Sequence, residues 1–282
     1  GVQTCALPIC EVFSGVSSGS IGASAIAGRI PMIEIIRSLK GKSKKLPPFK
    51  STTLYDFAGA EVTRRIVSQM TDWGGLDPNK WVQNILRSIP TGFFKGQGLK
   101  NYIEKGIKAY GTPNNFSQID VDLLIGVTNH DTFEHVIMGL PPWDNVNISD
   151  AVRASCALPP FFLPQKIEGQ GFIDGQITRT CNLEEMVRRG CNLIFIIDPL
   201  LPYTTFEPGS VDSLGGLNTV IQTIKSLVNT RFRSALGHVT ERYPDVDFLV
   251  FQPIEECAQA MSGSPMKLRA KTEIVDLAFK VT

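Results

Sequence analysis

The chain has 282 residues, of which 43% are apolar and 20% charged, so it can bury a sizeable core as one large domain or two small ones. Its formal net charge of +1 argues against a nucleic-acid-binding protein, because such proteins usually carry a strong basic excess. The sequence contains no unbroken apolar run of about 18 residues, and its six cysteines follow neither a C-x-x-C nor a zinc-ligand spacing, so we expect no transmembrane helix, no zinc site and free thiols in a reducing compartment.

The first ten residues, GVQTCALPIC, show neither helical nor strand periodicity. Val2–Ile9 reads like the translation of a sequencing-library adapter, which would make residues 1–10 a non-native leader; the alternative is a loop that precedes the first strand. On both interpretations we expect the native N-terminus to lie outside this sequence. The absence of a signal peptide at residue 1 therefore carries no information about secretion.

Beyond residue 10, the pattern predicts helices that alternate with buried strands. Val12–Ser14 is typical of the end of a short strand. The run of small residues at Ser18–Gly28 has no charged face, so we expect a helix packed closely against a sheet.

The other expected elements are helices at Pro31–Leu39, several within 52–110 with turns at 73–81 and 89–98, Ile148–Cys156 with a cap at Ser149 or Asp150, Leu183–Arg189 and Leu217–Tyr243, and strands at Val121–Thr128, Phe133–Gly139, Gly171–Asp174, Leu193–Asp198 and Val246–Phe251. The first two of these strands read as a hairpin. The continuous apolar run Leu193–Asp198 is typical of a strand that is covered on both faces. Together these elements predict a three-layer α/β/α fold with a mainly parallel central sheet.

One motif points to a nucleophile. Residues 15–19 spell G-x-S-x-G, the sharp strand-to-helix turn that presents a nucleophilic serine, here Ser17. A chance match in a chain this rich in glycine has a probability on the order of a tenth, so its support comes from the apolar strand before it and the small-residue helix after it. We expect Gly15 and Gly19 to remove side chains that would collide with the strand and helix. The N–H groups at the start of the helix, that of Ser18 included, are expected to face a developing oxyanion.

Histidines are the usual bases for such a serine. His238 is the only histidine late enough in the chain for the Ser–Asp–His order of an α/β-hydrolase, yet it falls within a helical pattern. His130 and His135 bracket two acidic residues without the i, i+4 spacing of H-E-x-x-H, so we expect no metal site there.

A carboxylate is the other candidate base. Asp174 ends an apolar strand and is followed by Gly175. A short carboxylate on a strand-end turn is held firmly, as a general base must be, and partial desolvation would raise its pKa. The alternative is an ordinary Asp-Gly turn.

Three segments, in the same order, resemble the patatin-like phospholipases, a family of serine lipid acyl hydrolases with a Ser–Asp dyad: GVSSGSIGA at the nucleophile, AVRASCALPPFFLP at Ala151–Pro164, and FIDGQITRTCNL around the base. LLIGVTNHDTFEHVIMG resembles the strand pair between the two sites, and the resemblance covers most of residues 11–255. It implies that Ser17 is the nucleophile and Asp174 the base. It also implies an acyl-enzyme on Ser17, no metal or cofactor, and no catalytic role for the histidines.

The chain departs from the family pattern at two places. Asp174-Gly175-Gln176 stands where the family has D-G-G or D-G-A, which enlarges a side chain next to the base. The glycine-rich oxyanion loop of the family has no counterpart upstream of Gly15, and loss of one oxyanion donor typically costs roughly 3–4 kcal/mol. We therefore expect residues 11–282 to form a single patatin-like catalytic domain that lacks its first strand and glycine-rich loop. Residues 272–282 end within a helical pattern, so we expect the C-terminus to be incomplete as well.

The resemblance implies a phospholipid or another acyl ester as substrate, with transient contact with a membrane surface, no nucleic acid and no obligate protein partner. The expected location is the cytoplasm or the periphery of a membrane. Basic residues that could contact anionic headgroups are Lys40, Lys42, Lys44, Lys45, Arg231 and Arg233, and aromatic residues that could line an acyl channel are Phe93, Phe94, Phe161 and Phe162. A solvated loop and ordinary core packing are the alternatives for these two groups.

Two other functions stay open at this point. One is a catalytically inactive patatin-fold domain that binds lipid or a protein. The other is a Ser–Asp–His triad esterase that uses His238.

Overall fold

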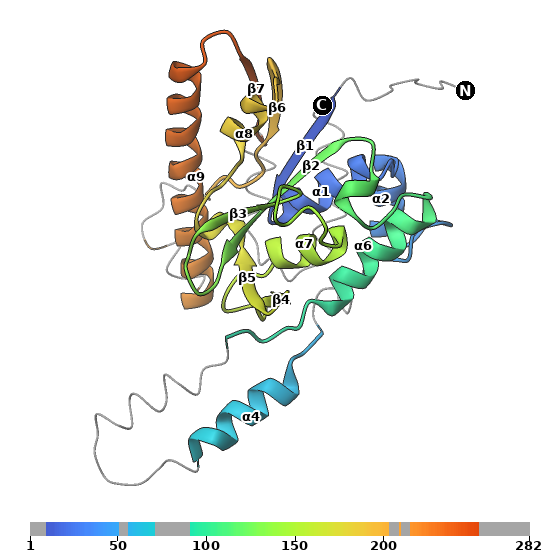
Figure 1. Ribbon diagram of the computed structural model, residues 1–282. Coiled ribbons are helices and arrows are strands. Elements are labelled where there is room, and N and C mark those ends of the chain that lie inside the picture. The colour runs from blue at the N-terminus through green and yellow to red at the C-terminus, as the bar shows by residue number, and fades with distance from the viewer. Residues whose placement is uncertain (1–9, 51–55, 71–90, 203–208, 210–214, 254–282) are drawn as a thin grey trace.

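The computed structural model describes residues 10–50, 56–70, 91–202, 209 and 215–253 (Figure 1). The main sheet has five strands, with β1, β2, β5 and β4 in that order and β3 beside β2. A second sheet pairs β6 with β7. The strands are β1 (Val12–Val16), β2 (Asp122–Asn129), β3 (His135–Met138), β4 (Gln165–Ile167), β5 (Gln170–Asp174), β6 (Leu193–Ile197) and β7 (Asp247–Phe251).

The helices match the predicted positions closely. They are α1 (Ser18–Ala27), α2 (Met32–Leu39), α4 (Gly59–Met70), α6 (Gln97–Ala109), α7 (Ile148–Ser155), α8 (Leu183–Arg188) and α9 (Gly216–Arg242), with short 3-10 turns η1 (Phe116–Gln118) and η2 (Gly175–Ile177). Figure 1 shows α9 on one side of the strands and α1, α6 and α7 on the other. Within the described ranges, no helix combines the length and the apolar character needed to cross a bilayer.

The predicted α/β class is confirmed, and the sheet is mixed rather than mainly parallel. The pairs β1–β2 and β6–β7 are parallel, whereas β2–β3, β2–β5 and β4–β5 are antiparallel. The predicted hairpin is the β2–β3 pair. Connections of a few residues reverse the chain after β2 and β4, and a reversed chain pairs antiparallel, because parallel pairing requires a long crossover.

Helix α1 packs directly on the main sheet, as its small residues predict. Ser20, Ala23, Ser24 and Ala27 are buried, and their short side chains let the helix backbone approach β1 and β2 closely. This packing fixes the start of α1, and with it the residue that joins β1 to α1.

The expectation for Leu193–Asp198 is wrong in one respect: within the described ranges, β6 is covered on one face only. Ile194 and Ile196 are 1% and 9% exposed and pack with residues of α8 and α9 such as Leu183 and Phe232. Phe195 points to the other face, where it is 52% exposed and stacks on Phe251 of β7. An apolar run therefore did not distinguish one covered face from two.

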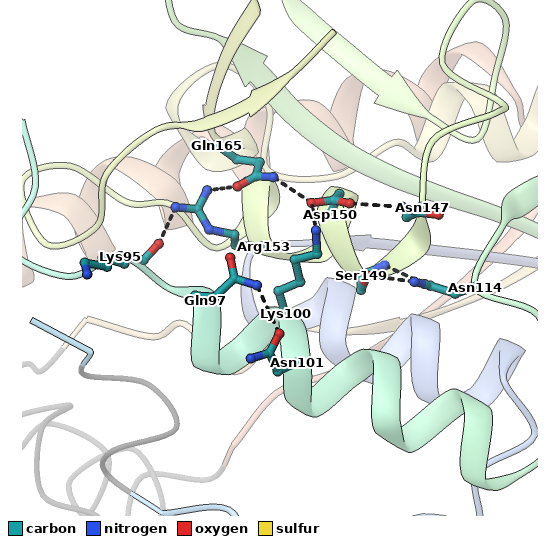
Figure 2. Close-up of polar contacts among 10 residues, drawn as sticks. All are labelled: Lys95, Gln97, Lys100, Asn101, Asn114, Asn147, Ser149, Asp150, Arg153 and Gln165. Atoms are coloured by element: carbon teal, nitrogen blue, oxygen red, sulfur yellow. Dashed lines mark hydrogen bonds and ion pairs between the residues drawn. The ribbon is translucent and has the colours of Figure 1, made fainter. Parts of the chain in front are cut away.

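Helix α7 is held by polar contacts at its start and along its length (Figure 2). Its N-cap is Asn147 rather than the predicted Ser149 or Asp150. Ser149 N–H instead donates to Asn114 Oδ1 at 2.9 Å, and its hydroxyl accepts from Asn114 Nδ2 at 2.8 Å. The carboxylate of Asp150 binds Lys100 Nζ of α6 at 2.7 Å.

The guanidinium of Arg153 lies one turn further along α7 and is almost fully buried. It donates hydrogen bonds to Gln165 Oε1 of β4 and to the carbonyl oxygen of Lys95 (Figure 2). The amide of Gln165 in turn donates to Asp150 Oδ1 at 2.6 Å. These contacts tie α7 to α6 and β4, and so fix the position of the C-terminal end of α7.

Several predictions fall on residues outside the described ranges. They are most of the leader (1–9), the turn at 73–81 and the helical pattern at 272–282.

Candidate active site

The predicted nucleophile Ser17 stands between β1 and α1, at the turn that the G-x-S-x-G motif predicts. Its backbone has φ 53° and ψ −129°, a conformation that costs a residue with a side chain about 1–3 kcal/mol. A Cβ on Gly15 would lie 2.4 Å from the carbonyl oxygen of Gly19, so only glycine fits at position 15. A Cβ on Gly19 would meet nothing within 4 Å, so the expectation that Gly19 avoids a collision is wrong. The close approach involves the backbone of Gly19, which any residue would supply.

The predicted base Asp174 comes from the end of β5 and meets Ser17 directly. Ser17 Oγ donates a hydrogen bond to Asp174 Oδ2 at 2.6 Å, although 157 residues separate the two. The register of β2 explains the meeting: Gly126 pairs with Val16, and the next residue, Val127, pairs with Asp174. Strand β2 therefore brings the C-terminal ends of β1 and β5 next to each other.

The environment of Asp174 favours a base that works near neutral pH. Its side chain is fully buried, and burial raises the pKa of the carboxyl from 3.8 to about 7. Hydrogen bonds from Ser17 Oγ and from the Gln176 N–H, the latter to Oδ1 at 2.9 Å, act in the opposite direction. A carboxyl with this pKa is a stronger proton acceptor than an exposed aspartate.

Gly175 lies in a space that excludes any side chain. A Cβ on this residue would lie 2.3 Å from the carbonyl oxygen of Gly126. Gln176, the residue that departs from the family pattern, donates its backbone N–H to Asp174 Oδ1. Because this hydrogen bond comes from the main chain, it does not depend on which side chain stands at position 176.

The first two residues of α1 directly follow Ser17. Ser18 and Gly19 are exposed and are the first residues of α1, so their N–H groups have no acceptor within the helix. The positive end of the helix dipole adds to the attraction for an anion. The predicted oxyanion role of the Ser18 N–H stays a prediction, as does the absence of a glycine-rich loop.

Two residues that the sequence analysis did not single out hold the backbone of Ser17. Ser155, the last residue of α7, is fully buried; its Oγ accepts the Ser17 N–H at 2.8 Å and donates to the Gly126 carbonyl oxygen at 2.7 Å. The Cys156 thiol donates to the Ser17 carbonyl oxygen at 3.2 Å. Burial and the nearby charge of Asp174 raise the pKa of this thiol to about 12, so it stays protonated and remains a donor. The only signal in the sequence was the position of both residues within AVRASCALPPFFLP.

No histidine takes part in the hydrogen bonds that the described residues make to Ser17 and Asp174. His238 lies on the exposed side of α9. The ring of His135 binds Thr178 Oγ1 at 3.1 Å and Asn182 Oδ1 at 2.8 Å. Burial lowers the pKa of His135, which favours the neutral ring.

The structure shows contacts of some of the residues that could contact lipid. Phe94 pairs through its backbone with Phe162 and packs ring to ring with it at 5.8 Å, while Phe93 is 38% exposed. Of the basic residues, Lys45 lies over the Tyr110 ring at 4.9 Å. An acyl channel and a headgroup contact stay predictions.

Comparison with known proteins identifies the family of the chain. The family described as patatin-like phospholipase matches residues 4–187. Among solved structures, VipD from Legionella pneumophila is 16% identical with a TM-score of 0.24, a likeness too slight to carry an argument. The alignment covers 57% of this chain and 39% of the VipD chain. The family match spans well over half of the sequence, and the chain therefore belongs to the patatin-like phospholipase family.

Proposed function

We propose that this protein is a lipid acyl hydrolase that cleaves acyl esters with Ser17 as nucleophile and Asp174 as general base. The observation that carries the proposal is the 2.6 Å hydrogen bond from Ser17 Oγ to the buried Asp174 carboxyl. Membership of the patatin-like phospholipase family supports a lipid substrate.

The reaction proceeds in two halves. Ser17 Oγ attacks the ester carbonyl carbon while its proton passes to Asp174 Oδ2, and the carbonyl oxygen becomes an oxyanion that faces the N–H groups of Ser18 and Gly19. The tetrahedral intermediate collapses, the bond to the alcohol breaks, and the alcohol leaves with the proton from Asp174. A water molecule then attacks the acyl-Ser17 ester, gives its proton to Asp174 and releases the fatty acid. Ser17 finally recovers this proton from Asp174.

The backbone around Ser17 supports this assignment. Its N–H donates to Ser155 Oγ, and its C=O accepts from the Cys156 thiol and the Ser20 hydroxyl, so the backbone that carries the Ser17 hydroxyl is held in place. A triad through His238 is not supported, because Ser17 Oγ donates its hydrogen bond to Asp174 and His238 lies on the exposed side of α9.

Hydrolysis of a short-chain nitrophenyl ester and of phosphatidylcholine vesicles tests the proposal. We expect the wild type to hydrolyse at least the soluble ester. Ser17→Ala and Asp174→Asn should each lose about 1000-fold or more in kcat, because Ser17 Oγ donates and Asp174 accepts the proton in the proposed reaction. His238→Ala is the matched control and should keep wild-type activity. Activity that survives in Ser17→Ala, or that is lost in His238→Ala, would refute the dyad. Binding of the vesicles without hydrolysis in any variant would favour an inactive lipid-binding domain.

A further inference from the structure

Helix α9 lies outside the part of the chain that matches the family, yet it contacts the turn that follows the base. Arg231 Nη1 donates a hydrogen bond to the carbonyl oxygen of Ile177 at 2.7 Å, and Nη2 donates one to the carbonyl oxygen of Gln176 at 2.7 Å. We propose that Arg231 is a positioning residue for Asp174: it holds η2, and with it the Gln176 N–H, against the carboxyl of the base. The inference rests on the proposed function, which assigns Asp174 as the base.

The chemistry of the guanidinium suits this role. It presents several N–H donors in a rigid plane, so two neighbouring carbonyl oxygens that it binds are fixed relative to each other. A positive charge is also favourable next to carbonyl oxygens at the end of a helical turn.

The effect reaches the nucleophile through a short chain of contacts. The same residue whose carbonyl oxygen Arg231 binds, Gln176, donates its N–H to Asp174 Oδ1 at 2.9 Å. The other oxygen of Asp174 accepts the Ser17 hydroxyl. Because the Gln176 hydrogen bond lowers the pKa of Asp174, a looser turn should raise that pKa further above its ordinary value.

Helix α9 is itself held firmly next to this contact. Phe232, the neighbour of Arg231, is 5% exposed and belongs to the apolar cluster of Leu183, Ile194 and Ile196. This burial fixes the position of α9 relative to η2, so the Arg231 side chain can hold the η2 carbonyl oxygens in place.

The chain provides a matched control. Arg233 follows two positions later on α9 and is exposed like Arg231, but it makes no hydrogen bond or ion pair with any other described residue. Arg231→Ala and Arg233→Ala therefore remove the same side chain from the same helix. Arg231→Lys keeps the charge but offers a single ammonium group, so it should restore part of the effect.

The first readout does not require activity: amide hydrogen exchange in the full chain, followed at Gln176 and Thr178. We expect Arg231→Ala to speed exchange at these amides about tenfold or more, because an anchored turn exchanges only after it opens. Arg233→Ala should leave the rates unchanged, and Arg231→Lys should fall between. Equal exchange in the two alanine variants would overturn the inference, whether or not the protein hydrolyses esters.

The second readout is the pH profile of ester hydrolysis, which a merely structural contact would not move. In Arg231→Ala the apparent pKa of the rising limb should shift upward, so that kcat/KM falls about threefold to tenfold at pH 6 and much less at pH 9. Faster exchange with an unshifted profile would overturn the positioning role and leave only a structural anchor. If the wild type hydrolyses no ester, the proposed function fails separately, and the exchange rates still decide whether Arg231 holds the turn.

Discussion

The hydroxyl of Ser155 accepts a hydrogen bond from the backbone N–H of Ser17 at 2.8 Å, across 138 residues of sequence. The same hydroxyl donates to the carbonyl oxygen of Gly126, so one buried side chain joins α7, β2 and the turn that carries Ser17. Ser17 has a positive φ, and a residue with a side chain keeps such a conformation only when its surroundings impose it. Ser155 supplies one of the contacts that impose it.

Replacement of this hydroxyl should therefore weaken both the fold and the reaction. Ser155→Ala leaves the Ser17 N–H and the Gly126 C=O without their partner, which should lower the free energy of unfolding by about 1–3 kcal/mol and kcat by about tenfold. Urea denaturation and ester hydrolysis measure the two effects. Ser24→Ala serves as control, because Ser24 is also buried but its hydroxyl donates to the Ile21 carbonyl oxygen within its own helix. A Ser155→Ala variant as stable and active as the control would show that the contact is dispensable.

The raised pKa of Asp174 predicts how activity depends on pH. Only the carboxylate accepts the Ser17 proton, so kcat/KM should rise with pH, reach half of its maximum near the pKa of about 7, and then level off. A pH series with a neutral ester, whose own charge does not change, measures this. Full activity already at pH 5 would mean that the base has an ordinary carboxyl pKa.

The same pKa predicts how stability depends on pH. Asp174 binds its proton more tightly in the native than in the unfolded state, so its contribution to the free energy of unfolding is largest at acid pH and falls between pH 3.8 and about 7. Asp174→Asn removes the buried charge. At pH 8 this variant should be more stable than the wild type by on the order of 2–4 kcal/mol, with a smaller difference at pH 5. Thermal unfolding at the two pH values measures it, and an Asn variant that is less stable at pH 8 would contradict the prediction.

The two glycines of the motif should respond differently to alanine. In Gly15→Ala the new methyl group meets the backbone of Gly19 and Ser20, so we expect a loss of about 2 kcal/mol or more in unfolding free energy. In Gly19→Ala the methyl group meets open space, and the change should stay within about 0.5 kcal/mol. Melting temperatures of the two variants give the comparison. Equal losses at both positions would mean that the turn is packed differently.

Much of this arrangement could be predicted from local pattern. Three elements follow from patterns of a few consecutive residues: the small-residue helix α1, the hairpin of β2 and β3, and the strand that ends in Asp174. The structure has all three. Such patterns also mark Ser17 and Asp174 as candidates, and the structure brings the two into a hydrogen bond. Their catalytic roles stay a prediction.

The rest depends on contacts between distant segments. Nothing in Arg231-Phe232-Arg233 distinguishes the arginine that binds η2 from the one that does not, because the difference arises from how α9 lies beside β6. The face of β6 that no described residue covers is hard to predict for a related reason: hydropathy reports which residues are apolar, but not how many layers cover them.

The most direct test of the central claim is covalent labelling of the full chain with a fluorophosphonate, followed by mass spectrometry of the modified peptide. The account predicts a single adduct on Ser17, absent in Ser17→Ala and formed at least about 100-fold more slowly in Asp174→Asn, where no carboxylate accepts the proton. A folded wild-type protein that takes up no label, or that is labelled at another residue, would contradict the assignment of Ser17 and Asp174 as a catalytic pair.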